Sequence, residues 1–152
     1  MDIKKKISKA DLEKKTEDFL SLHWNNKVLR VLTAKWESYY FKGSIPNQDK
    51  QGCYALGRED QIIYIGVGAS HKEGLYKEYG IGSRLSSHVI KWDRTIPSNH
   101  IEDRVYKPRE RWKGVTEIYT FGLPSNYGYL ALALEAFLIS ELKPESNVTR
   151  TR

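Results

Sequence analysis

The 152-residue sequence has little cysteine and no long apolar run. Cys53 is the single cysteine, so no disulfide can form within the chain and a small fold held together by cystines is excluded. The longest stretch free of charged side chains, residues 118–134, contains a proline and two glycines, and it is too short and too polar to span a bilayer. Mixed charge near Met1 leaves no apolar segment for a signal peptide. We therefore expect no membrane association and a cytoplasmic location.

Several common catalytic motifs are also absent. The chain has no HExxH, CxxC or G-x-S-x-G sequence and no phosphate-binding loop of the G-x-x-x-x-G-K-[ST] type, which argues against the chemistries that depend on these motifs. Positive charge is present instead: 25 Lys and Arg against 19 Asp and Glu give a formal net charge of +6. This excess favours a polyanionic partner such as nucleic acid.

The hydrophobic pattern predicts an α+β fold with a small, mostly antiparallel, three-stranded sheet in a ββαβα core flanked by helices. Residues 1–48 are expected to form an N-terminal helical arm, with one helix to about Leu22 and a second over residues 27–40, that wraps DNA or makes a dimer contact. Residues 49–152 form the main domain. Its predicted elements are strands over 52–56, 62–66 and 115–121 and helices over 81–92 and 129–142.

One carboxylate stands in an otherwise apolar helical segment. Residues 130–139 are all apolar except Glu135, and burying an unpaired charge is costly. Glu135 is therefore either at the rim of its helix, paired with a basic residue in the core, or a ligand of a metal ion.

Two further patterns carry chemistry. Arg84 and His88 are four residues apart on the predicted helix, so they project side by side and could address one phosphate together; the alternative is a solvated pair on an amphipathic helix. Tyr54 and Tyr64 stand on the two strands of a predicted hairpin, where tyrosines more often serve packing.

Taken in order, these residues resemble the signature of the GIY-YIG nuclease superfamily. The similarity covers residues 52–147 and is greatest to the type II restriction endonuclease branch, which implies the fold expected above. The matching positions are Gly52-Cys53-Tyr54, Tyr64-Ile65-Gly66, Arg84, His88, Glu135 and Asn147.

The sequence departs from the family pattern near the hairpin. Cys53 replaces the usual isoleucine, which a buried apolar position tolerates. Val67 stands where a lysine often follows the second half of the signature, and the segment between Gly66 and Arg84 is longer than in compact members. This longer segment contains Lys72 and Lys77, either of which could supply the auxiliary positive charge.

The resemblance implies hydrolysis of a DNA phosphodiester by an in-line water, giving a 5′-phosphate and a 3′-hydroxyl. It implies one Mg²⁺, for which Mn²⁺ would substitute, held mainly by Glu135, with Arg84 stabilising charge on the phosphate. Either Tyr54 or His88 would take the proton from the water. The other two matching residues would position the site: Tyr64 the water or phosphate, and Asn147 the local hydrogen-bond network.

Residues 104–113 carry five basic side chains against one acidic side chain, with Tyr106 and Trp112 interleaved. We expect them to bind double-stranded DNA through its phosphates. Cutting two strands requires two sites, which predicts a homodimer. The alternatives are a phage or repair nuclease with loose or structure-based specificity, and a nucleic-acid-binding protein that keeps the scaffold without cutting. The expected DNA-binding residues are Arg104, Lys107, Arg109, Arg111, Lys113, Lys72 and Lys77.

Overall fold

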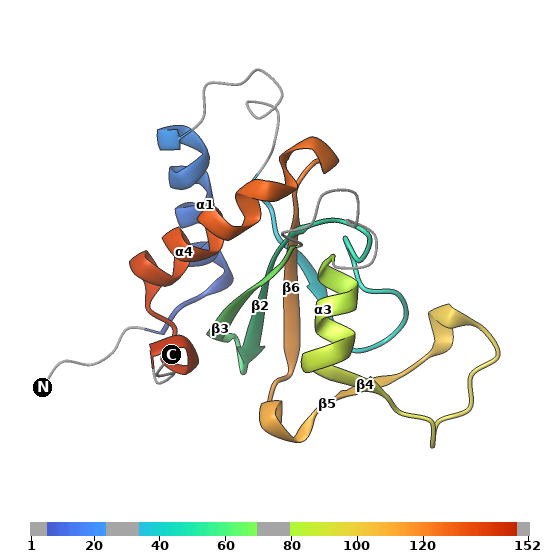
Figure 1. Ribbon diagram of the computed structural model, residues 1–152. Coiled ribbons are helices and arrows are strands. Elements are labelled where there is room, and N and C mark those ends of the chain that lie inside the picture. Colours follow the sequence, from blue (N-terminus) through green and yellow to red (C-terminus); the bar gives the residue numbers. More distant parts are fainter. Residues whose placement is uncertain (1–5, 24–33, 70–79, 149–152) are drawn as a thin grey trace, which may run out of the picture.

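The computed structural model describes residues 6–23, 34–69 and 80–148. They form an antiparallel sheet of four strands in the order β1-β6-β2-β3 (Figure 1). This confirms the α+β class with a small antiparallel sheet. The sheet has one strand more than predicted, because a short segment near the N-terminus pairs with β6. The strands are β1 (Glu37–Tyr39), β2 (Gly52–Arg58), β3 (Gln61–Gly68) and β6 (Glu117–Gly122).

Helices cover both faces of this sheet. Figure 1 shows α1 and α4 packed on one face and α3 on the other. No helix within the described ranges is long and apolar enough to cross a membrane. The helices are α1 (Lys9–His23), α3 (Ile81–His88), α4 (Ala131–Leu142) and α5 (Glu145–Val148).

The alternation of side chains along β2 separates two cores. Cys53 and Ala55 belong to the cluster under α1 and α4, whereas Tyr54 and Leu56 belong to the cluster under α3. Successive side chains of a strand point to opposite faces, and both faces are covered here. This explains why β2 reads as an almost continuous apolar run rather than as an alternating one.

The N-terminal segment is part of the same core as the rest of the chain. Ser8 and Asp11 form a capping box, in which each backbone N–H donates to the other's side chain, at 2.9 and 3.1 Å. Leu12 and Phe19 of this helix are buried, whereas Leu22 near its end is 72% exposed. The helix predicted over residues 27–40 is wrong at β1, which is a strand, and residues 24–33 of it lie outside the described part of the chain.

A small second sheet follows α3. The predicted helix over residues 81–92 ends at His88, because the next residues, β4 (Ile90–Trp92), pair antiparallel with β5 (Tyr106–Pro108). The β-branched pair Val89-Ile90 at this point favours the extended conformation over the helix. Three short 3₁₀ helices complete the description: η1 (Ile101–Asp103), η2 (Glu110–Trp112) and η3 (Ser125–Leu130).

Candidate active site

The two signature tyrosines lie on the α3 face of the hairpin. Antiparallel pairing sets Tyr54 opposite Gly66 and Tyr64 opposite Leu56, and the two phenol rings are 6.2 Å apart between centroids. A Cβ atom at Gly66 would overlap the ring of Tyr54, lying 2.8 Å from its Cε1 atom. The glycine of the second half-signature is therefore required because the tyrosine of the first half lies across it.

Asn147 closes the free edge of the sheet beside the second tyrosine. Its Oδ1 atom accepts a hydrogen bond from the Ile65 backbone N–H at 2.8 Å, and its Nδ2 atom donates to the Ile65 carbonyl at 2.9 Å. β3 is an edge strand, so these two bonds replace the ladder that a further strand would supply. The side chain thereby holds the backbone next to Tyr64.

Arg84 and His88 project together from α3, as their spacing predicts. Both are exposed, and both line a pocket of about 190 Å³. Two serines that sequence reasoning missed share this pocket with Ala69: Ser83 and Ser87. The signal was present, because Ser83 and Ser87 have the same four-residue spacing on the same helix.

Electrostatic coupling joins Tyr54 to residues from two other elements. Burial raises the pKa of Tyr54 above its ordinary value, Tyr64 and Glu135 raise it further, and the charge and hydrogen bonding of Arg84 oppose the rise. Tyr54 is 3% exposed. The phenol is therefore protonated at neutral pH, and the charges of a carboxylate and a guanidinium act on its pKa in opposite directions.

Glu135 approaches the sheet from the side of α4. It is half-buried on that helix. Burial raises the pKa of the Cys53 thiol, and the charge of Glu135 adds to the rise. The carboxylate thus acts on neighbouring residues of β2 that point to opposite faces, Cys53 and Tyr54.

His88 stands in a positively charged setting. Loss of hydration, followed by the charges of Arg84, Arg109 and Arg111, lowers the pKa of His88 below 6.5. The imidazole is therefore neutral at pH 7 and has a nitrogen free of a proton. A neutral, exposed imidazole among arginines can accept a proton from a water held near a phosphate.

The described residues contain no cluster of three or more His, Cys, Asp or Glu side chains that could hold a metal ion. A dedicated cage of the zinc type is therefore not formed by them. Mg²⁺ has different needs, because it keeps several waters and is usually held by one or two carboxylates together with substrate phosphates. Glu135 is a single half-buried carboxylate, and one carboxylate can serve such an ion only together with waters and a substrate phosphate.

Trp112 supports the site, although it stands in the basic segment of the sequence. It is 7% exposed, and its ring packs on Tyr64 with centroids 4.7 Å apart. Arg111 lies over the Trp112 ring at 5.3 Å. No local pattern distinguishes this tryptophan from one that contacts DNA, since only the fold brings residues 64 and 112 together.

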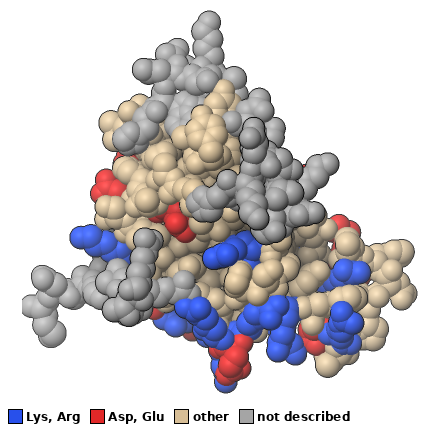
Figure 2. Space-filling model, in the orientation of Figure 1, with Lys and Arg blue, Asp and Glu red and all other residues tan. Residues whose placement is uncertain are grey.

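The expected DNA-binding residues lie in different settings. Figure 2, in the orientation of Figure 1, shows Lys and Arg side chains gathered in the lower part of the view, near β4 and β5. Arg109 is half-buried and donates to the Ser86 and Ile90 carbonyls at 2.6 and 3.0 Å, which ties it to the end of α3. The remaining residues divide as follows: Lys107, Arg111 and Lys113 are exposed, Arg104 is half-buried, and Lys72 and Lys77 lie outside the described ranges.

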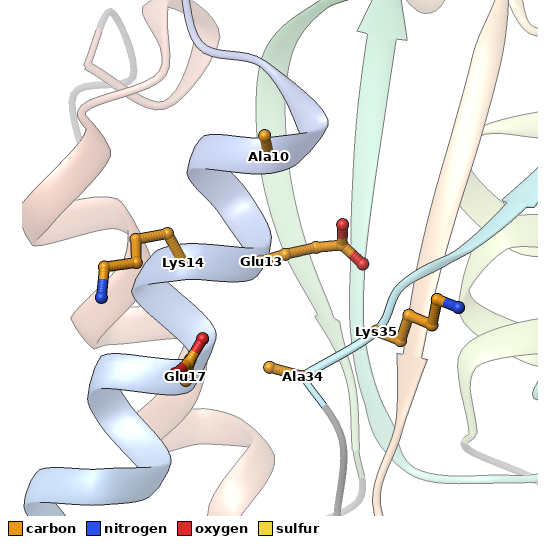
Figure 3. A pocket seen from close by; sticks show the side chains of 6 residues that line it. All are labelled: Ala10, Glu13, Lys14, Glu17, Ala34 and Lys35. Carbon is orange, nitrogen blue, oxygen red and sulfur yellow. The ribbon is translucent and has the colours of Figure 1, made fainter.

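A second hollow lies on α1, away from the tyrosines. It has a volume of about 340 Å³ and is lined by α1 and residues 34–35. Figure 3 shows Glu13 pointing from the helix toward that segment, where its Oε2 atom accepts a hydrogen bond from the Trp36 backbone N–H at 3.0 Å. This carboxylate has a structural partner, so the pocket beside Arg84 and His88 is the stronger candidate site.

Comparisons with protein-family models, with curated proteins and with solved structures found no match to the chain. A functional argument therefore depends on the residues themselves. The hairpin sets the two phenols 6.2 Å apart, α3 places Arg84 and His88 at one pocket, and the charges of Arg84 and Glu135 both act on Tyr54. Such a set can bind a phosphate, accept a proton from water and hold a divalent cation.

Proposed function

We propose that the protein is a metal-dependent DNA endonuclease with a GIY-YIG-type site, of the type II restriction kind, which leaves 5′-phosphate and 3′-hydroxyl ends. One observation carries the proposal: the Tyr54 and Tyr64 rings lie 6.2 Å apart on the sheet face under α3, and the charges of Arg84 from α3 and of Glu135 from α4 both act on the Tyr54 phenol. These residues are far apart in the sequence. Their convergence on one phenol is unusual for groups that serve only packing.

Arg84 is the residue for the scissile phosphate. Its guanidinium is exposed at the pocket and adjoins Tyr54, so it can bind a non-bridging oxygen and stabilise the negative charge that grows during attack. Glu135 would hold Mg²⁺, which supplies Lewis-acid stabilisation of the same charge when bound. Mn²⁺ would substitute.

The proton acceptor is His88 rather than Tyr54. The pKa of Tyr54 is raised, so removing its proton near neutral pH is unfavourable. The pKa of His88 is lowered, so it is already neutral there. Tyr54, which is buried and adjoins Arg84, is instead suited to position that guanidinium, with Tyr64 and the Asn147 clamp fixing the strand behind it.

The partner we propose is double-stranded DNA, bound by a homodimer in the cytoplasm. The exposed basic residues near β4 and β5 adjoin the pocket through Arg109 and Arg111, whose charges reach His88. A phosphate backbone crossing this surface would place one phosphate at Arg84. Each subunit would then cut one strand.

The test is cleavage of supercoiled plasmid in Mg²⁺ by purified protein. We expect Glu135→Gln to reduce cleavage by about 10³-fold while DNA binding persists, since the carboxylate acts on the chemistry. Glu141→Gln removes an exposed carboxylate from the same helix and should cut at the wild-type rate. Full cleavage activity of Glu135→Gln would refute the role of Glu135 as the metal-holding carboxylate.

Mapping the cut ends separates the proposed class from its alternatives. Ends at one fixed sequence support a restriction enzyme, and scattered ends indicate a nuclease with loose or structure-based specificity. DNA binding with no cleavage by the wild-type protein in Mg²⁺ or Mn²⁺ would show a binding protein on the same scaffold.

A further inference from the structure

The pocket beside Arg84 lies where the end of β3 meets the start of α3. A Cβ atom on Gly68, the last residue of β3, would lie 2.7 Å from the Ile81 nitrogen, so the strand and the helix are in direct contact. The Ile81 N–H also donates to the Lys50 carbonyl at 2.9 Å. Ala69, the residue after this strand, lines the pocket together with α3. The pocket is therefore part of the packed body of the fold, and little order has to be gained when a ligand binds.

Helix α3 turns different faces to the core and to the pocket. Ile81 and Leu85 are fully buried in the core cluster of this side of the sheet, which fixes the rotation of the helix. Ser83 and Ser87 are exposed, and both line the pocket with Arg84. Side chains four residues apart on a helix lie next to each other. The two hydroxyl groups therefore share one pocket with the guanidinium.

The described lining of this pocket contains hydrogen-bond donors but no carboxylate. Arg84 is permanently charged, and each serine hydroxyl can rotate to donate to a suitable acceptor. His88 is neutral at pH 7 because its pKa is lowered, so this lining carries one full positive charge. It favours a group with one negative charge, as each phosphodiester of DNA has. The described lining residues are Ala69, Ser83, Arg84, Ser87 and His88.

The size of the pocket points to the same kind of group. Its volume is about 190 Å³, which is below the roughly 300–1,000 Å³ of pockets that enclose drug-sized ligands. A water molecule takes about 30 Å³ in the liquid. The pocket therefore has room for a phosphate group with a few waters rather than for a larger ligand.

Serine is not the residue that an exposed helical position itself prefers. Three of the eight residues of α3 are serines, and serine forms helices less well than alanine because its hydroxyl competes for backbone hydrogen bonds. Neither Ser83 nor Ser87 is buried, so packing does not require a hydroxyl at either position. Ser86 is exposed on the same helix but lies outside the described lining of the pocket, which makes it a matched reference.

We propose that the Ser83 and Ser87 hydroxyls donate hydrogen bonds to the non-bridging oxygens of the phosphate that Arg84 binds. This rests on the proposed function and adds two phosphate-binding residues to its site. Neutral donors beside one guanidinium hold the oxygens of a phosphodiester without adding charge, and they orient the phosphorus for attack.

Cleavage of supercoiled plasmid in Mg²⁺ under single-turnover conditions is the first measurement. We expect Ser83→Ala and Ser87→Ala each to lower the rate by about tenfold, and the double variant by about a hundredfold, because each loses a hydrogen bond to a charged group. Ser87→Thr keeps the hydroxyl and should cleave at close to the wild-type rate. Ser86→Ala keeps the backbone carbonyl that accepts a hydrogen bond from Arg109 and should also cleave normally.

Binding of inorganic phosphate is the second measurement, and it does not depend on cleavage. The backbone amide signals of α3 are followed by NMR while phosphate is added to the full-length protein. We expect saturable shifts in the wild-type protein and in Ser86→Ala, and an affinity about tenfold lower in the double Ser83→Ala, Ser87→Ala variant. The same spectra report folding, which alanine should preserve because it is the better helix former.

The two measurements separate failure of the serine assignment from failure of the proposed function. If the double alanine variant binds phosphate with wild-type affinity, the serine assignment is overturned whatever its cleavage rate, and the nuclease stands if the wild-type protein cleaves. An α3 that does not respond to phosphate in the wild-type protein also overturns the assignment. Serine-dependent phosphate binding without plasmid cleavage by the wild-type protein would support the phosphate pocket and overturn the nuclease.

Discussion

The two faces of the sheet are covered by helices of different length and composition. On one face, α1 and α4 bury a cluster that includes Cys53, Leu134 and Leu138, each fully buried. On the other, the eight-residue α3 covers Tyr54 and leaves Arg84 exposed at a pocket. Both faces therefore carry a buried apolar core of similar size. The α3 face differs because it also presents Arg84 and His88 at one pocket, which teaches that a well-packed face of the sheet can carry exposed polar groups as well.

A substitution in the core under α1 and α4 should show the largest effect on the free energy of unfolding. Leu134→Ala deletes a fully buried side chain from α4, and we expect a loss of about 2–5 kcal/mol in the free energy of unfolding. Urea unfolding followed by circular dichroism measures it. Leu22→Ala, on an exposed position of α1, is the control and should change little. A loss of free energy of unfolding no larger than that of Leu22→Ala would contradict the role of Leu134 in this core.

On the α3 face, we expect the exposed Arg84 to affect cleavage strongly and the free energy of unfolding little. Arg84→Gln removes an exposed guanidinium, so we expect cleavage to fall by about 10²–10³-fold while the unfolding transition stays nearly unchanged. Lys14→Gln removes one positive charge from α1, where its ion pair with Asp18 is exposed and contributes little. Equal cleavage by the two variants in a plasmid assay would remove Arg84 from the site.

At Gly66, one substitution should affect both stability and cleavage. Gly66→Ala would force a Cβ atom into the ring of Tyr54, which costs about 1–3 kcal/mol as an overpacked site and displaces the phenol from Arg84. Tyr54→Phe would leave the overlap, whereas in a Tyr54→Ala background the ring is absent, so Gly66→Ala should cost little further stability. Thermal unfolding of the single and double variants tests this, and additive effects would count against contact between the two positions.

Asn147 tests whether the edge of the sheet supports the site. Asn147→Ala removes both bonds to Ile65, and we expect a loss of about 1–3 kcal/mol together with faster hydrogen exchange at the Ile65 amide. Ser140→Ala, at an exposed position on α4, should leave that exchange unchanged. An Ile65 amide that stays protected in Asn147→Ala would contradict the clamp.

The smallest expected effect concerns pH. The lowered pKa of His88 keeps the imidazole neutral, so cleavage should fall only as pH drops through that pKa, below 6.5. Arg111→Gln removes one of the charges that lower the pKa, so the pKa of His88 rises and the acid limb of the pH–rate profile moves to higher pH. Titration of the His88 ring signal by NMR measures the same shift. A limb that does not move would exclude His88 as the proton acceptor.

Local pattern predicted much of the molecule. The capping box at Ser8, the hairpin that carries both tyrosines, and α4 around Glu135 were all readable, because periodicity and turn chemistry act over a few residues. The pairing of Arg84 with His88 follows from helical geometry alone. Errors occurred where a longer-range contact prevailed, as at β1 and at the end of α3.

The sequence by itself determined the class of fold, the identity of the polar residues and their order along the chain. Only the tertiary structure decided that Glu135 acts on Tyr54, that Trp112 packs on Tyr64, and that β4 pairs with β5 after α3. The physical reason is range: helical spacing and turns are encoded within one segment, whereas strand pairing and packing depend on which distant surfaces fit together.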